Sequence, residues 1–161
     1  MRKLQVVAVF LLVISGSAFT EQPLLQLPFP AGVQYLCTQG PGEIYSHNGV
    51  TTRYDLDFDT PNDQDHVVVA SISGIAYIHY SNGPDGFGNH VNIDVGNGLF
   101  VIPGSHLKSF SIQNGQWVDQ GQVIGIEGCT GNCSGDHIHY GLHEGDPSQD
   151  AGQSVSVIAE R

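Results

Sequence analysis

Apolar residues in this chain come in short runs or alternate with polar residues, and turn-forming residues separate the runs. Alternation with a period of two is typical of strands that bury one face, and no stretch of ten or more residues shows the 3.6-residue period of an amphipathic helix. Turn signals such as Asn97-Gly98 and Asn114-Gly115 stand between runs. The expected strands cover residues 33–37, 54–58, 67–72, 75–80, 90–95, 99–102, 123–127 and 137–142. The pattern predicts an all-β chain with one antiparallel β-sandwich or partly open barrel.

The two ends of the chain differ from this pattern. Residues 1–18 combine a basic start (Arg2 and Lys3), an unbroken apolar run over residues 6–14 and a small-residue end, as in a secretory signal peptide. An N-terminal core helix is the alternative. Residues 19–32 form a Pro-rich approach to the domain, which we place at 33–145, and residues 146–161 are either a tail or an edge strand. We therefore expect a secreted or periplasmic protein.

The net charge of the chain limits the classes of molecule that it can bind. The chain has 5 basic and 16 acidic residues, a formal net charge of −11, and removal of Arg2 and Lys3 would make it more acidic still. Nucleic-acid binding needs a cationic face, so it is excluded as a function. The apolar run at the N-terminus is too short to span a bilayer, and no later segment is long and apolar enough. Eight histidines in an acidic chain point instead to a bound cation.

The cysteines fit an exported protein. Cys129 and Cys133 lie close together in GCTGNCSGD and could form a disulfide in an oxidising compartment. A zinc site that uses this pair is the alternative, although a single CxxxC is a weak signal. Cys37 would be left over, and we expect it to be buried near the start of the domain.

Two alternating segments carry the candidate chemistry. His137 and His139 in GDHIHYGL are two residues apart on an expected strand, so both imidazoles project from one face. Such a pair suits two metal ligands, or one ligand beside a proton-transfer group; two solvent-exposed histidines are the alternative. In YDLDF, Asp55 and Asp57 share the face opposite Leu56. Either carboxylate could complete a metal site, or both could be solvated.

The order of these motifs resembles a known family. The set His47, Asp57, GFGNHVNID, SHL and VDQGQVIGIEGCTGNCSGDHIHY is similar to the lysostaphin/LytM-type zinc endopeptidases, secreted enzymes that cut peptide bonds in bacterial peptidoglycan. The resemblance covers residues 44–144. It implies the duplicated hybrid motif fold of that family and a substrate peptide from peptidoglycan. We expect a monomer.

The resemblance also assigns the site. It implies that His47, Asp57 and His139 hold one Zn²⁺ per chain, and that His106 and His137 are catalytic. It favours Asp57 over Asp55, because relatives often carry a small residue at the position of Asp55. Two His and one Asp leave the fourth tetrahedral position of zinc for water, which the metal makes acidic. His137 could take the proton of that water and pass it to the leaving amine, and His106 could donate to the oxyanion.

One feature departs from the pattern: nine residues lie between His47 and Asp57, a longer loop than in the best-known members. The remaining histidines match no ligand position, and we expect His79 and His143 on the surface. His90 and Asp136 are candidates for supporting contacts. Two other functions stay open, a non-catalytic peptidoglycan-binding or hydrolase-activating member of the same fold, and a biotinyl/lipoyl-like carrier. A carrier would need a lysine at a hairpin tip, and Lys108 is the only lysine after the signal segment.

Overall fold

The computed structural model describes residues 24–59, 65–81, 83–149 and 151–156, and within these ranges the chain contains strands and turns but no helix. The all-β prediction is therefore confirmed. The predicted signal peptide, residues 1–18, and the first residues of the approach segment lie outside the described residues. In the described part of the chain there is accordingly no helix that could cross a membrane.

Eleven strands are described, and most of them are short. Their bounds are β1 Leu36–Gln39, β2 Leu56–Asp59, β3 Val67–Val69, β4 Gly74–His79, β5 His90–Gly96, β6 Leu99–Gly104, β7 Ser109–Phe110, β8 Gln116–Val118, β9 Val123–Ile126, β10 Ile138–Glu144 and β11 Gln153–Val155. The short strands β7 and β8 were not expected from the sequence, because two or three residues are too few for alternation to be visible.

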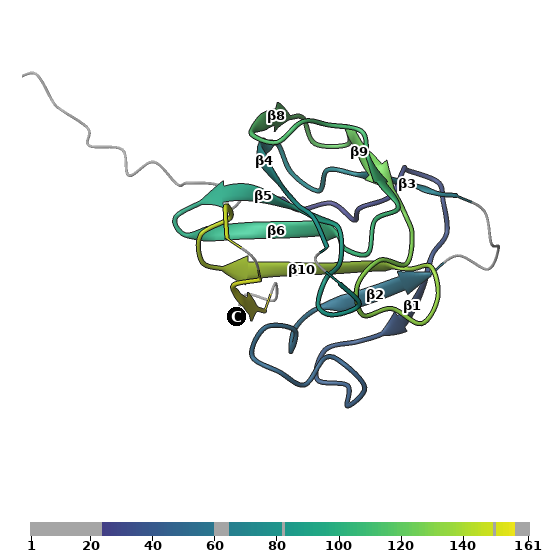
Figure 1. The fold of residues 1–161 in the computed structure, drawn as a ribbon. Coiled ribbons are helices and arrows are strands. Elements are labelled where there is room, and N and C mark those ends of the chain that lie inside the picture. Colours follow the sequence, from purple (N-terminus) through teal and green to yellow (C-terminus); the bar gives the residue numbers. More distant parts are fainter. Residues whose placement is uncertain (1–23, 60–64, 82, 150, 157–161) are drawn as a thin grey trace, which may run out of the picture.

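The strands form two antiparallel sheets (Figure 1). The large sheet has the order β1-β2-β10-β6-β5-β4-β8, with β11 paired to β10, and the small sheet has the order β3-β9-β7. Apolar side chains of both sheets form one core, which includes Val68, Ile93, Val101, Ile124 and Ile138. Their burial is the main stabilising contribution to the fold. Leu25 and Phe29 of the approach segment pack against the same core.

Strand β10 is the central element for the site. It pairs with β2 through His139↔Asp57 and with β6 through Gly141↔Ile102. Its C-terminal half pairs with β11, where Leu142 lies opposite Val155. The C-terminal segment is thus an edge strand over residues 153–155. Because side chains alternate along a strand, His139 and Asp57 project from the same face of neighbouring strands.

The turn chemistry behaves as the sequence indicates. Asn97 and Gly98 connect β5 and β6 with φ angles of 56° and 75°, which is the left-handed pair that a two-residue type I′ hairpin requires.

The cysteines are partly as expected. The Cys129–Cys133 disulfide is present, with the two Cα atoms 5.3 Å apart. Cys37 is free and exposed, so the expectation that it is buried was wrong. It lies on β1, an edge strand of the large sheet, whose first three residues are all exposed.

Candidate metal centre

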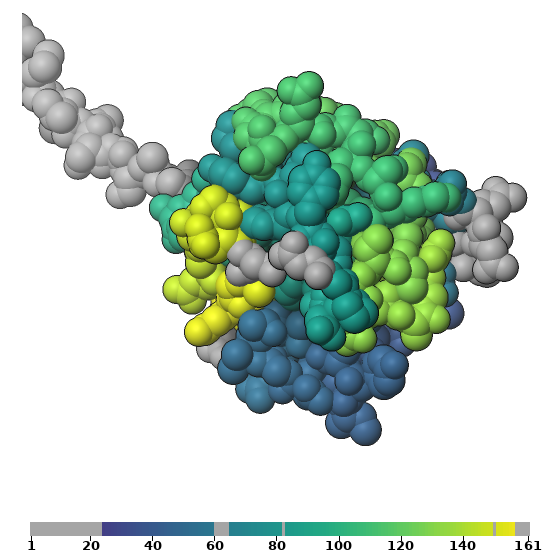
Figure 2. All heavy atoms as spheres, viewed as in Figure 1, coloured from purple at the N-terminus to yellow at the C-terminus, as the bar shows by residue number. Residues whose placement is uncertain are grey.

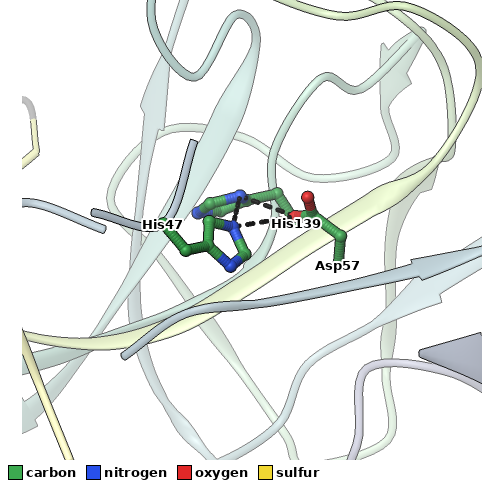
Figure 3. Close-up of side chains that lie close together, drawn as sticks. All are labelled: His47, Asp57 and His139. Carbon is green, nitrogen blue, oxygen red and sulfur yellow. Dashed lines mark hydrogen bonds and ion pairs between the residues drawn. The ribbon is translucent and has the colours of Figure 1, made fainter. Parts of the chain in front are cut away.

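Three side chains from distant parts of the sequence meet at one point. His47 comes from the loop before β2, Asp57 from β2 and His139 from β10, and all three are buried. Figure 3 shows the two imidazoles and the carboxylate turned toward one another. His47 Nε2 lies 3.4 Å from His139 Nδ1 and 3.4 Å from Asp57 Oδ1. His139 Nδ1 lies 2.8 Å from Asp57 Oδ1.

These separations suit a metal ion. Zinc bonds of about 2.0–2.1 Å in a tetrahedron place neighbouring ligand atoms roughly 3.3 Å apart. The three facing atoms come within 4.8 Å of one another. Asp57 Oδ1 is buried and has no hydrogen bond of good geometry among the described residues. A buried carboxylate oxygen left in this way, opposite two ring nitrogens, fits a cation better than a protein hydrogen bond.

Hydrogen bonds to His47 and His139 determine which nitrogen of each ring carries a proton and which has a free lone pair. His47 Nδ1 lies 3.1 Å from the carbonyl oxygen of Gly40, and His139 Nε2 lies 2.8 Å from Asp55 Oδ2. A carbonyl or carboxylate oxygen only accepts, so each of these nitrogens carries the proton and donates it. In the neutral rings, His47 Nε2 and His139 Nδ1 are therefore left with lone pairs. Those are the atoms that meet at Asp57, as metal binding requires.

Neighbouring charges shift the pKa values of both Asp57 and His139. Burial alone would raise the pKa of Asp57, but the close imidazoles of His139 and His47 outweigh it and hold that pKa far below its ordinary value. Burial alone would lower the pKa of His139, but Asp55 and Asp57 on its two sides raise that pKa to about 9. Without a metal, a proton on His139 balances two buried carboxylates. A bound cation would take over that role and displace the proton.

His106 and His137 lie beside this group. Their ring centroids are 4.6 Å apart, and His137 Nε2 is 3.9 Å from Asp57 Oδ1. His106 Nδ1 donates to the carbonyl oxygen of Thr130 at 2.7 Å, and His137 Nδ1 donates to that of Gly135 at 2.8 Å. In both neutral rings Nε2 is therefore the unprotonated atom. The structure brings all five site residues expected from the sequence into one neighbourhood.

His106 occupies an unusual position. Its φ angle is 60°, a left-handed conformation that costs a non-glycine residue energy and often marks a functional site. Burial and then the charge of neighbouring His137 lower the pKa of His106 to about 4, against a smaller opposing effect from the carbonyl of Thr130. His106 is thus neutral at physiological pH, and its Nε2 accepts a proton rather than donating one.

Asp57 and His139 of this group, together with His106 and His137, line a cleft of about 710 Å³. Figure 2 shows the segments over residues 40–55, 83–88 and 129–137 side by side on one face of the molecule. Residues from all three segments line the cleft, among them Tyr45, Asn48, Phe87, Asn132 and Ser134. A β-carbon on Gly88 would overlap with Thr130, and one on Gly131 would come within 2.8 Å of the carbonyl oxygen of Gly86. Glycine is required in both loops because they cross at van der Waals contact.

Two other expectations need correction. His143 was expected on the surface, but its side chain is completely buried, with Nε2 3.2 Å from Asp55 Oδ1. Asp55 is not a solvated carboxylate either, since it is also 0% exposed. The alternating pattern of HIHYGLHE did place His139 and His143 on one face. The sequence did not reveal that the His143 ring packs against Phe87 and Phe100 and reaches the carbonyl oxygen of Ala151 in the loop before β11.

The carrier alternative finds no support in the position of Lys108. This lysine lies between β6 and β7 rather than at a hairpin tip, and its Nζ donates to both carboxylate oxygens of Asp65 at 2.8 Å. A carrier lysine must instead present a free amine for modification. Lys108 is exposed and ion-paired, which is ordinary for a surface lysine.

Comparison with known proteins agrees with this geometry. Residues 46–153 match the sequence family described as peptidase family M23. The peptidoglycan DD-endopeptidase ShyA of Vibrio cholerae is 42% identical over 55 residues, which is 34% of this chain and 13% of ShyA. The chain therefore spans only a small part of the length of this relative.

Two solved structures are also similar. The catalytic domain of the prophage-encoded M23 protein EnpA from Enterococcus faecalis, solved as a mutant, superimposes with a TM-score of 0.63 and 25% identity, covering 81% of this chain and 94% of that one. Lysostaphin from Staphylococcus simulans gives a TM-score of 0.58 and 25% identity over 74% of this chain and 47% of that one. The resemblance seen in the sequence motifs thus extends to the arrangement of the sheets.

Proposed function

The chain belongs to peptidase family M23, and we propose that it is a zinc-dependent endopeptidase that hydrolyses peptide bonds in the cross-links or stem peptides of bacterial peptidoglycan. One observation carries the proposal. A buried group of two imidazoles and one carboxylate lies in a cleft, with two further histidines beside it. A non-catalytic binding module has no need of this full set.

We infer that His47, Asp57 and His139 hold one zinc ion per chain. Asp57 and His139 also help to line the cleft, so a cation held by the three residues would be accessible to a substrate there. A bound zinc would supply Lewis-acid chemistry, because it polarises the scissile carbonyl and makes water acidic enough to attack near neutral pH. The backbone carbonyl of Gly40 accepts from His47 Nδ1 and so keeps the other ring nitrogen of His47 aimed at the group.

His106 and His137 would handle the protons. In its neutral form each ring presents an unprotonated Nε2, so either can accept the proton that the attacking water loses. We assign this step to His137, whose Nε2 is 3.9 Å from Asp57 Oδ1, together with delivery of the proton to the leaving amine. Neutral His106 can donate to the oxyanion only after it has taken up a proton. Its low pKa would make such a proton easy to release.

The proposed substrate fits a site outside the cytoplasm. The name of ShyA describes action on peptidoglycan, a material of the cell envelope. The predicted signal peptide and the disulfide are consistent with export, since disulfides persist in oxidising compartments. Secretion or periplasmic location and a monomeric state remain parts of the proposal.

The test begins with metal content. Purified mature protein, washed free of loosely held ions, should retain about one zinc per chain, and the His139→Ala variant should lose most of it. His66→Ala is the matched control, because the His66 ring packs edge-on against Tyr35 and is not among the residues that line the cleft. Purified peptidoglycan is then digested with parent and variants, and new amino groups are counted with chelator and after zinc is restored.

Hydrolysis that disappears with chelator and with His139→Ala, but not with His66→Ala, would support the proposal. Peptidoglycan with direct cross-links and peptidoglycan with glycine bridges, compared side by side, would show which bond is cut. If the parent binds no zinc even after zinc is supplied, the enzymatic function is wrong. A peptidoglycan-binding or hydrolase-activating role would then be the better explanation.

A further inference from the structure

Behind the candidate metal centre lies a second polar group that the proposed chemistry does not use. Asp55 is fully buried between two histidines of β10. Its Oδ2 is 2.8 Å from His139 Nε2, and its Oδ1 is 3.2 Å from His143 Nε2. A buried carboxylate is unfavourable unless it is paired, so this arrangement needs an explanation.

The backbone makes room for this carboxylate. In the register of β2 and β10, His139 lies opposite Asp57 and Tyr140 opposite Leu56, so the next step places Asp55 opposite Gly141. A β-carbon on Gly141 would overlap with the Asp55 carboxylate and come within 2.6 Å of His143 Nε2. Gly141 has a β-strand conformation and needs no left-handed φ. Its lack of a side chain therefore creates the space that Asp55 fills.

His143 is itself held in place from three sides. Its Nδ1 donates to the carbonyl oxygen of Ala151 at 2.7 Å, and its ring stacks on Phe100 at a centroid distance of 5.5 Å. Phe87 packs against both His143 and His139, at 5.9 Å and 5.0 Å. The ring held in this way faces the buried carboxylate, with His143 Nε2 3.2 Å from Asp55 Oδ1.

We propose that Asp55, braced by His143, is a positioning residue for the zinc ligand His139. This inference rests on the proposed function, since it assumes that His139 binds zinc. The Asp55 carboxylate fixes the His139 tautomer with Nδ1 free, holds the ring toward Asp57 and makes that nitrogen a stronger donor to a metal. Removal of such a carboxylate partner typically weakens metal affinity about 10–100-fold. His143 keeps the carboxylate at the correct angle, because its ring is itself fixed by Ala151 and Phe100 and lies against Asp55 Oδ1.

The test measures affinity for Zn²⁺ alone, by competition with a chromogenic chelator, on the full mature chain. Asp55→Ala should bind zinc at least about tenfold more weakly than the parent. The zinc affinity of Asp55→Asn should lie between those of the parent and Asp55→Ala, because an amide can accept from His139 and donate to His143 but carries no charge. His143→Gln should also weaken binding, less than Asp55→Ala. Glu144→Gln is the matched control: it removes a carboxylate from the exposed end of β10, and its affinity should equal that of the parent.

A second readout separates positioning from a general loss of structure. Long-range ¹H–¹⁵N spectra report which nitrogen of each histidine carries its proton. In zinc-loaded parent, His139 should be protonated at Nε2, and in Asp55→Asn that signal should shift while the backbone spectrum stays the same. If Asp55→Ala does not fold, the zinc affinities of Asp55→Asn and His143→Gln test the positioning role instead. Parent-like zinc affinity in these two variants, with an unchanged His139 signal, would overturn the inference.

The two proposals fail in different ways. If the parent itself binds no zinc, the proposed function fails and the positioning role fails with it. If the parent binds zinc tightly and the Asp55 and His143 variants bind it equally well, only the positioning role is wrong. Neither outcome depends on a peptidase assay.

Discussion

The carbonyl oxygen of Thr130 accepts the Nδ1 proton of His106 at 2.7 Å, and this single contact determines which nitrogen His106 presents to the cleft. Thr130 lies within the loop that the Cys129–Cys133 disulfide closes. Its side-chain hydroxyl accepts from the backbone N–H of Asn89 at 2.8 Å, in the glycine-rich turn. Two loops that are far apart in sequence therefore control the proton chemistry of one histidine.

The close crossing of these loops predicts that Gly88→Ala reduces activity. A β-carbon there would overlap with Thr130, and the φ of 63° is unfavourable for alanine. The Thr130 carbonyl must move, so His106 loses its fixed tautomer. We expect a fall in kcat of tenfold or more, with a stability loss on the order of 2 kcal/mol. Peptidoglycan hydrolysis by the zinc-loaded variant and denaturant unfolding measure the two effects.

Gly83→Ala is the control for this variant, because a β-carbon at Gly83 has no neighbour within 4 Å. It should behave like the parent in both assays. Full activity in Gly88→Ala would show that the position of Thr130 does not matter for His106.

Reduction of the Cys129–Cys133 disulfide should loosen the loop whose Thr130 carbonyl oxygen holds His106. In the chain-entropy account, a bridge across so short a loop contributes about 2 kcal/mol to stability. The Cys129→Ser/Cys133→Ser variant should unfold at correspondingly lower denaturant, and its kcat should fall. A reducing agent should affect the parent in the same way and leave that variant unchanged. Cys37→Ser, which alters an exposed free thiol, should respond to reductant like the parent.

Zinc should stabilise the folded chain, because the ligands converge only after folding. A ligand present at a thousand times its Kd and bound only by the native state adds about 4 kcal/mol. His47→Ala should abolish most of this effect, since it removes the ligand that ties the loop before β2 to the site. Thermal unfolding with zinc and with chelator gives the comparison. Tyr45→Ala, at an exposed position of the same loop, should keep the zinc effect; an equal zinc effect in His47→Ala would remove His47 from the ligand set.

Glu127 should make stability depend on pH. It is only 3% exposed, and burial, followed by the charges of Asp59 and Asp136, raises its pKa from 4.5 to about 7. A raised pKa means that the folded state binds the proton more tightly than the unfolded state. The resulting stabilisation is complete below about pH 4.5 and is lost as the pH rises through 7.

Glu127→Gln mimics the protonated acid and should remove this dependence. The difference in unfolding free energy between variant and parent should grow from near zero at pH 4.5 to on the order of 3 kcal/mol at pH 8. Denaturant unfolding of the metal-free proteins at several pH values measures it, and contributions from other titrating groups cancel in the difference. A difference that stays constant with pH would mean that folding does not raise the pKa of Glu127.

The sequence by itself determined the class of fold and the chemistry of the site. Alternation with a period of two shows which residues share a strand face, so the pairs His137/His139 and Asp55/Asp57 were readable from local pattern alone. The hairpin turn at Asn97-Gly98 was equally local. The ligand set itself came from the order of motifs rather than from any single one of them.

Only the tertiary structure decided the strand register and the burial of individual side chains, because both depend on residues that are distant in the sequence. Strand register sets Asp57 beside His139 and Asp55 opposite Gly141, and register depends on which strands pair. His143 carries the same pattern as an exposed residue, and it is buried through contacts with Phe87, Phe100 and the carbonyl oxygen of Ala151. Cys37, by contrast, stays exposed because β1 is an edge strand. Burial is a property of what packs against a residue, and those partners lie up to a hundred positions away along the chain.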